Sequence, residues 1–230
     1  MVPTPTPDAD FADRNASVIR DFSVPSRALL VAFGGIAGQM EMPPFEFFRH
    51  AGSLEVKRMF VRDLDQCWYQ TGIRGLGDGV GATAEALTLE TERAAVDRVV
   101  YTGNSAGGYA AILFGALTDA DAVVAFSPQT TLIRARYVRS HDRLDAMNRT
   151  TTDRRFLDLR EVVRAHSSVS IHVHYAQWNR LDRFHARRIR HLPSVTLHGH
   201  SHVRHSLVRS LRDSGELRSI FQEVLGLLPS

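Results

Sequence analysis

The segment from residue 98 to residue 114 constrains the fold more than any other part of the chain. It reads RVVYTGNSAGGYAAILF, an apolar run that enters a glycine-rich turn and leaves it as a second apolar run. The turn at residues 103–107, GNSAG, has the pattern G-x-S-x-G. Between a strand and a helix, this pattern forms a sharp turn that exposes the serine hydroxyl at the helix N-terminus. We therefore predict a strand over 98–102, a helix over 109–117 and a nucleophilic Ser105 between them.

Short apolar runs alternate with helical patterns along the rest of the chain. Continuous apolar runs typical of strands buried on both faces occur at 26–33 and 121–126, and further strands are predicted at 55–63, 169–176 and 195–198. Helical spacing is found over 82–95 and from 206 to 212, after which Gly215 interrupts the last helix. This alternation predicts an α/β fold of three layers, with helices on both faces of a mainly parallel, doubly wound sheet.

The length of 230 residues, of which 43% are hydrophobic, suits one well-buried domain. We expect this domain to occupy residues 26–230 and to follow a flexible N-terminal tail and lead-in at 1–25.

The stretch from 129 to 168 is too long for an ordinary connection between two elements. It contains nine arginines against five acidic residues, and its apolar residues between 156 and 163 predict helical parts. Because it leaves the C-terminal end of a strand, we expect it to form a small helical lid over the edge of the sheet where ligands bind. Its arginines, with Arg154 and Arg155 as the candidate substrate contacts, suit a carboxylate, a phosphate or a carrier-linked acyl group. The alternative is a solvated structural excursion.

A serine hydroxyl needs a base that takes its proton and an acid that orients the base. On a strand–turn–helix serine, the chain order is serine, then acid, then histidine. Asp182 follows the apolar run at 169–176 and precedes a helical pattern that begins at Arg183, so it is the candidate acid. The other role for Asp182 is a helix N-cap, which is compatible with the first.

The candidate bases are histidines that follow the last predicted strand. His205 stands directly before the final helix and is favoured over His202, at the tip of the same loop, and over His200. His198 continues the alternation of the strand, so we expect it to pack. The alternating histidines also suggest a metal site, but the sequence has no H-E-x-x-H, no paired carboxylates and no cysteine cluster to complete one. We expect no metal and no cofactor.

An oxyanion hole needs two backbone N–H groups aimed at the developing charge. One is expected from Ala106, the residue after the nucleophile. The other is expected from Gly35 or Ile36, where the run at 26–33 ends in glycines that let the backbone approach a substrate closely. The alternative is a plain glycine-rich turn between a strand and a helix.

Residues 26–225 resemble the α/β-hydrolase family of serine hydrolases. The resemblance rests on the glycine pair at 34–35, the turn at 103–107, Asp182 after a late strand and a histidine after the last one. It implies that Ser105 attacks a carbonyl, that His205 or His202 relays the proton, and that Asp182 holds the imidazole. Residues 33–35 read FGG and lack the HGGG of the lipase-like branch of that family.

The resemblance implies a hydrolase that cleaves an ester or thioester through an acyl-enzyme on Ser105. One alternative is an acyltransferase that uses the same three residues with an alcohol or amine acceptor. Another is a non-catalytic binding protein on a hydrolase fold, against which the complete ordered set of residues counts.

Composition limits the partners and the cellular setting. The net charge is +3 without an interleaved basic and aromatic pattern, so we expect no nucleic acid, and no apolar run is long enough for a membrane span. The single cysteine, Cys67, excludes an internal disulfide and is expected to be a buried or semi-buried spectator. The N-terminus lacks the features of a secretory signal, so we expect a cytoplasmic protein that acts on a small-molecule or carrier-linked acyl substrate.

Overall fold

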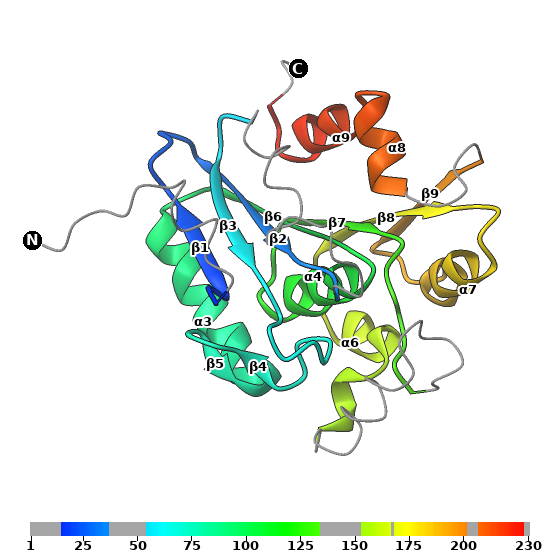
Figure 1. Ribbon diagram of the computed structural model, residues 1–230, viewed down its shortest axis with the longest axis horizontal. Helices are drawn as coiled ribbons and strands as arrows, with labels where there is room; N and C mark the ends of the chain where they lie inside the picture. Colours follow the sequence, from blue (N-terminus) through cyan, green and yellow to red (C-terminus); the bar gives the residue numbers. More distant parts are fainter. Residues whose placement is uncertain (1–14, 37–53, 134–152, 167, 202–206, 228–230) are drawn as a thin grey trace, which may run out of the picture.

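The computed structural model describes residues 15–36, 54–133, 153–166, 168–201 and 207–227 (Figure 1). Seven strands form one sheet in the order β1-β3-β2-β6-β7-β8-β9. The strands are β1 (Val18–Asp21), β2 (Ala28–Phe33), β3 (Lys57–Val61), β6 (Arg98–Asn104), β7 (Ala122–Phe126), β8 (Ser170–Ala176) and β9 (Val195–His200). All neighbouring pairs are parallel except β1 with β3, which confirms the mainly parallel sheet.

Strand β1 lies inside the range 1–25 that was expected to be a tail and lead-in. Val18 pairs with Val61 and Asp21 with Arg58, so this part of the lead-in is an edge strand of the sheet. Ion pairing reinforces the register, because the Arg58 guanidinium also contacts the Asp21 carboxylate.

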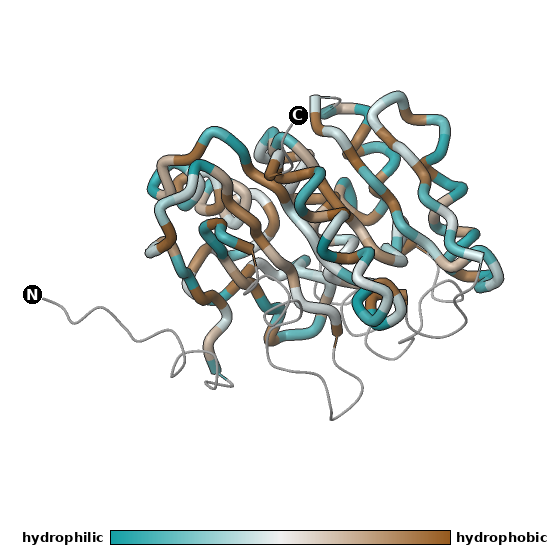
Figure 2. Tube along the Cα trace, turned by 90° about the horizontal axis from the view of Figure 1, so that it is seen from above, coloured by the Kyte–Doolittle hydropathy of each residue, from teal (hydrophilic) through white to brown (hydrophobic). Residues whose placement is uncertain are grey.

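Helices cover both faces of the sheet, as predicted. They are α3 (Gly79–Ala94), α4 (Ala106–Leu117), α6 (Leu159–Ala165), α7 (Arg180–Ile189), α8 (Leu207–Asp213) and α9 (Glu216–Val224). Helices α8 and α9 lie on one face and the other four on the opposite face (Figure 1). Each face has its own buried apolar cluster, one around α4 and one beneath α8 and α9. Outer helices alternate between hydrophilic and hydrophobic residues in Figure 2, as expected of helices with one buried side.

Gly215, with φ of 82°, separates α8 from α9 at the predicted interruption. A small second sheet of β4 (Gly72–Ile73) and β5 (Gly77–Asp78) was not predicted. Within the described ranges, no helix combines the length and the apolar character that crossing a membrane requires.

Of the stretch at 129–168, the structure describes residues 129–133, 153–166 and 168. The part at 153–166 contains a 3-10 turn, η2 (Arg154–Phe156), and α6, which packs against α4 and α7. The expected apolar side is buried at Leu157, Leu159, Val162 and Val163. Backbone hydrogen bonds from Leu132 N to Leu157 O (2.9 Å) and from Leu159 N to Thr130 O (3.1 Å) tie this part to the exit of β7. Its closure over the site stays a prediction.

Candidate active site

Ser105 occupies the predicted turn between β6 and α4. Its backbone has φ of 55° and ψ of −112°, a positive-φ conformation that is costly for a residue with a Cβ. A Cβ on Gly103 would overlap the backbone of Gly107, and a Cβ on Gly107 would overlap the carbonyl oxygen of Phe33. The two glycines of the pattern are therefore required by the close approach of β6, α4 and the end of β2.

Backbone hydrogen bonds hold this turn in place. Ser105 N donates to Phe126 O on β7 (2.9 Å), and Ser105 O accepts from Tyr109 N (3.0 Å) and from Gln129 N (3.3 Å). The predicted strand–turn–helix arrangement is confirmed, with the helix starting at Ala106 instead of residue 109.

The candidate oxyanion loop lies directly against the turn. A Cβ on Gly107 would come within 3.0 Å of the carbonyl carbon and oxygen of Gly34, so this peptide and the first turn of α4 are neighbours. Ala106 is the first residue of α4, and Gly35 and Ile36 follow Gly34. The structure thus brings together the segments that carry all three predicted donors, whose role as an oxyanion hole stays a prediction.

Asp182 lies in the first turn of α7 and is 8% exposed. The helix begins at Arg180, three residues earlier than predicted, because the Asn179 side chain accepts hydrogen bonds from Leu181 N (3.0 Å) and Asp182 N (3.2 Å). The N-cap role considered for Asp182 therefore belongs to Asn179. This leaves the Asp182 carboxylate available to other partners.

One partner of that carboxylate is Ser127, whose hydroxyl donates to Asp182 Oδ2 at 2.8 Å. Ser127 follows β7 and has a positive φ of 43°, and its N–H donates to His174 O on β8 (2.8 Å). Because β6, β7 and β8 are parallel neighbours, Ser105, Ser127 and α7 all follow strand ends at the same edge of the sheet. Serine and candidate acid therefore share this edge.

The two favoured bases, His202 and His205, lie outside the described residues. The segment that carries them connects β9, which ends at His200, to α8, which begins at Leu207. Since β9 is parallel to β8, β9 also ends at the edge that carries Ser105 and Asp182. The choice between the two histidines stays a prediction.

Sequence reasoning missed a group of four stacked imidazoles, His172 and His174 on β8 with His198 and His200 on β9, called here the histidine ladder. The rings of His174 and His198 stack with centroids 4.4 Å apart. Nδ1 of His174 lies 3.1 Å from Nε2 of His200, and Nδ1 of His172 lies 3.2 Å from Nε2 of His198. The packing expected for His198 is confirmed. The signal that could have revealed this group is the histidine at every second position on both strands, because a parallel register places such histidines side by side.

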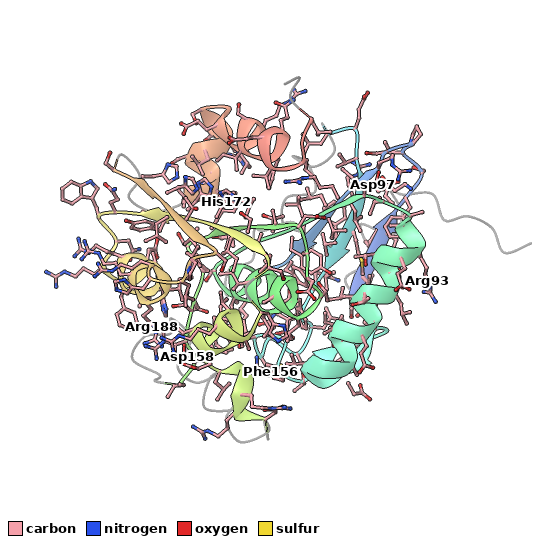
Figure 3. The ribbon with its side chains drawn as sticks, turned by 180° about the vertical axis from the view of Figure 1, so that it is seen from behind. Arg93, Asp97, Phe156, Asp158, His172 and Arg188 are labelled. Atoms are coloured by element: carbon pink, nitrogen blue, oxygen red, sulfur yellow. The ribbon has the colours of Figure 1, made fainter. Side chains whose placement is uncertain are left out.

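Burial favours the neutral form of the histidine ladder, because it lowers the pKa of all four imidazoles. Burial lowers the pKa of His174 to about 3, and the neighbouring imidazoles act in the same direction. His172 lies on the α8 side of the sheet (Figure 3). Within the described part of the chain, no three histidine, cysteine, aspartate or glutamate side chains are arranged to hold a metal ion.

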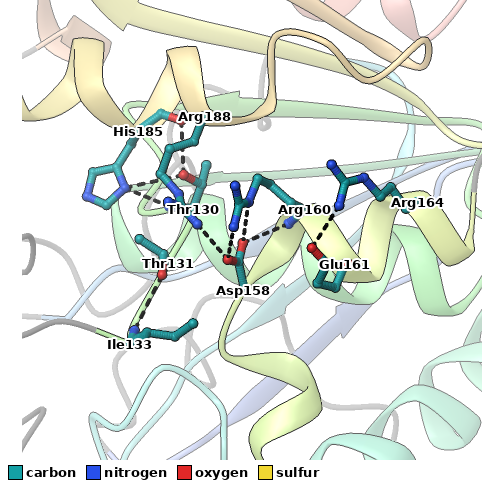
Figure 4. Close-up of polar contacts among 9 residues, drawn as sticks. All are labelled: Thr130, Thr131, Ile133, Asp158, Arg160, Glu161, Arg164, His185 and Arg188. Carbon is teal, nitrogen blue, oxygen red and sulfur yellow. Dashed lines mark hydrogen bonds and ion pairs between the residues drawn. The ribbon is translucent and has the colours of Figure 1, made fainter.

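On the opposite face, Asp158 joins α6 to α7. Its carboxylate pairs with Arg160 at 2.9 Å and with Arg188 at 2.5 Å (Figure 4). Burial alone would raise the pKa of Asp158, but the two guanidinium groups hold it below its usual value. His185 is buried with Nδ1 accepting from Thr130 N (3.0 Å), so this side chain attaches residue 130 to α7, whereas the Asp158 carboxylate attaches α6 to α7.

The two arginines predicted to contact substrate lie on η2. The Arg155 guanidinium pairs with Asp153 at 2.6 Å and lies 5.3 Å from the centre of the Phe156 ring. Arg154 is exposed. Cys67 is buried as expected, and burial, followed by the charge of Asp63, raises the pKa of its thiol.

No protein-family model matches the chain, and no curated protein does. Among solved structures, the chain is similar to the capsule O-acetyltransferase of Neisseria meningitidis serogroup A, with a TM-score of 0.67, 15% identity and coverage of 89% of this chain and 90% of that one. It is similar to an S-formylglutathione hydrolase from Agrobacterium tumefaciens, with a TM-score of 0.59, 14% identity and coverage of 87% and 85%. It is also similar to the esterase Est2 from Thermogutta terrifontis, with a TM-score of 0.58, 16% identity and coverage of 89% and 84%.

Proposed function

The chain has the α/β-hydrolase fold, and we propose that on this fold it cleaves an ester or thioester through an acyl-enzyme on Ser105. The observation that carries the proposal is the strained backbone of Ser105, with φ of 55°, at the junction of β6 and α4. Such strain persists where surrounding structure enforces it, and at a strand–helix junction it presents the hydroxyl to a substrate. Esterases and a hydrolase among the structural neighbours support ester chemistry.

In the proposed reaction, His205 or His202 takes the proton from Ser105 Oγ as this oxygen bonds to the carbonyl carbon. Asp182, held by Ser127, orients the imidazole. The N–H groups of Ala106 and of Gly35 or Ile36 stabilise the oxyanion. When the intermediate collapses, the histidine returns its proton to the leaving alcohol or thiol. Water then cleaves the acyl-enzyme by the same steps, which releases a carboxylic acid and restores Ser105.

Acyl transfer is the second candidate, in which an alcohol or amine replaces the water. The observation in its favour is the agreement with capsule O-acetyltransferase structures, one of them in complex with CoA, at TM-scores of 0.65 to 0.68. The esterases and the hydrolase give 0.53 to 0.59. For either reaction we propose a small-molecule or carrier-linked acyl donor. Arg154 is the stronger candidate for an anionic contact, because Arg155 already pairs with Asp153.

A fluorophosphonate probe tests the nucleophile, because it reacts covalently with an activated serine. We expect mass spectrometry to locate the label on Ser105, and we expect Ser105→Ala to abolish both labelling and turnover of short p-nitrophenyl esters. Ser168→Ala is the matched control: its hydroxyl contacts Asp119 (2.6 Å) ahead of β8, at the opposite edge of the sheet. Turnover that survives in Ser105→Ala would refute the serine mechanism. A protein that never labels would favour the non-catalytic alternative.

The two reactions are separated by their acceptor. With acetyl-CoA as donor, thiol release that is independent of added alcohols and amines indicates hydrolysis. Release that rises with an added acceptor, together with an acetylated product, indicates transfer.

A further inference from the structure

We propose that Tyr69 is a positioning residue for the oxyanion hole, because its hydroxyl fixes the peptide that joins Gly34 to Gly35. The catalytic meaning of this role rests on the proposed function. Tyr69 is fully buried, between the end of β3 and the small β4–β5 sheet. No pattern in the sequence marks it.

The hydrogen bond acts on the peptide plane that contains a predicted oxyanion donor. Tyr69 Oη donates to Gly34 O at 2.8 Å. In the described part of the chain every peptide bond is trans, so the Gly34 carbonyl and the Gly35 N–H point to opposite sides of one rigid plane. Holding the carbonyl toward Tyr69 therefore directs the Gly35 N–H away from Tyr69. On the other side of the residue, Gly34 N donates to Val61 O at 2.8 Å.

The same peptide lies against the nucleophile turn. Gly107, which follows the predicted donor Ala106, has no room for a Cβ beside Phe33 and Gly34. A rotation of the Gly34–Gly35 peptide would therefore change its contact with the first turn of α4. Tyr69 therefore holds a peptide that is packed against Gly107, in the first turn of the helix that follows Ser105.

The turn that carries Tyr69 is itself strained and strongly held. Trp68 and Tyr69 have φ of 55° and 61°, a left-handed conformation that aromatic residues rarely adopt. The Asp63 carboxylate accepts from Cys67 N at 2.7 Å and from Tyr69 N at 2.9 Å. The Tyr69 ring meets Phe33 edge to face, with centroids 5.7 Å apart. Such strain clusters at functional sites, where surrounding contacts enforce it.

The residues before and after Tyr69 are hydrogen-bonded to residues around the nucleophile turn. Trp68 Nε1 donates to Gln129 Oε1, and Gln129 N in turn donates to Ser105 O. Gln70 Nε2 donates to Tyr109 Oη at 3.0 Å, on the helix that starts after Ser105. Three consecutive side chains thus connect one strained turn to the oxyanion loop and to the serine.

The test compares Tyr69→Phe with Tyr101→Phe. Tyr101 is also fully buried and contacts the same Phe33 ring, but its hydroxyl bonds to Thr118 at the far end of α4 (3.2 Å). With a p-nitrophenyl ester, we expect Tyr69→Phe to lower kcat about tenfold or more with KM within about twofold, because the lost orientation matters in the transition state. We expect Tyr101→Phe to leave both constants within about twofold of wild type. Hydrogen–deuterium exchange on the full chain should show faster exchange at residues 34–36 in Tyr69→Phe alone.

Two results would overturn the proposal: equal effects of the two variants on kcat, or unchanged protection of residues 34–36 in Tyr69→Phe. Wild-type protein that neither labels with fluorophosphonate nor turns over an ester refutes the proposed function instead. In that case the exchange measurement still decides whether Tyr69 holds the loop. Thermal unfolding of both variants provides the check that each is folded.

Discussion

The histidine ladder predicts that the protein loses stability between pH 7 and pH 5. The pKa of His174 falls from 6.5 to about 3 on folding, first because the side chain is buried and then because of the neighbouring imidazoles. In the unfolded chain the His174 imidazole binds a proton as the pH falls through about 6.5, whereas in the native chain it binds one only near pH 3. Between these values the unfolded state carries more protons, so the free energy of unfolding falls as the pH falls through this window.

The magnitude follows from the two pKa values. At 1.36 kcal/mol per pKa unit, His174 alone lowers the free energy of unfolding by about 2 kcal/mol from pH 7 to pH 5. Burial also lowers the pKa values of His172, His198 and His200, so these groups act in the same direction, although Glu223 and Glu216 oppose the shift. The pKa of the paired Asp158 carboxylate is also lowered, so its contribution to the free energy of unfolding is lost only at more acidic pH.

Urea unfolding followed by circular dichroism at pH 7, 6 and 5 measures the effect. The variant His174→Phe keeps an aromatic ring beside Phe126. We expect its free energy of unfolding to fall by about 2 kcal/mol less than that of wild type between pH 7 and pH 5. His191→Asn, at an exposed position, is the control and should follow wild type. A wild-type stability that is flat from pH 7 to pH 5, or a His174→Phe variant with the full pH dependence, would refute the reasoning.

Two further predictions concern the base and the turn. His205→Ala should lower kcat on the order of a thousandfold, as loss of a triad member does, and His202→Ala much less; reversed effects in steady-state kinetics would assign the base to His202. Gly107→Ala should abolish the folded protein or lower its Tm sharply, since the added Cβ overlaps Phe33 O. By contrast Gly81→Ala, in α3 with open space around it, should stabilise by about 1 kcal/mol in thermal unfolding.

The parts of the fold that local patterns determine could be predicted from the sequence. The turn around Ser105 and the buried strands were predicted because glycine spacing and continuous apolar runs are signals within one segment. The start of α7 was misplaced because Asn179 and Asp182 are both good caps, and only the side-chain geometry selects Asn179.

Features that depend on partners distant in the sequence could not be predicted. Strand β1 has four residues and gains its hydrogen bonds from β3, about forty residues later. The histidine ladder depends on the register of β8 against β9. Neither Trp68 nor Tyr69 is a glycine or asparagine that would signal positive φ, and the turn is held by the Asp63 carboxylate together with tertiary contacts.

The burial of α4 has a consequence for how a protein of this kind can acquire new substrates. Every residue from Ala106 to Ala116 is buried, so the helix behind the serine has no side free to vary. Substitutions in α4 would destabilise the folded protein before they altered its substrate specificity. Variation is tolerated instead on loops at the same edge, such as the one after β8, where Trp178 is 72% exposed. Libraries that randomise this loop and leave α4 untouched should therefore yield folded variants with altered substrate preference.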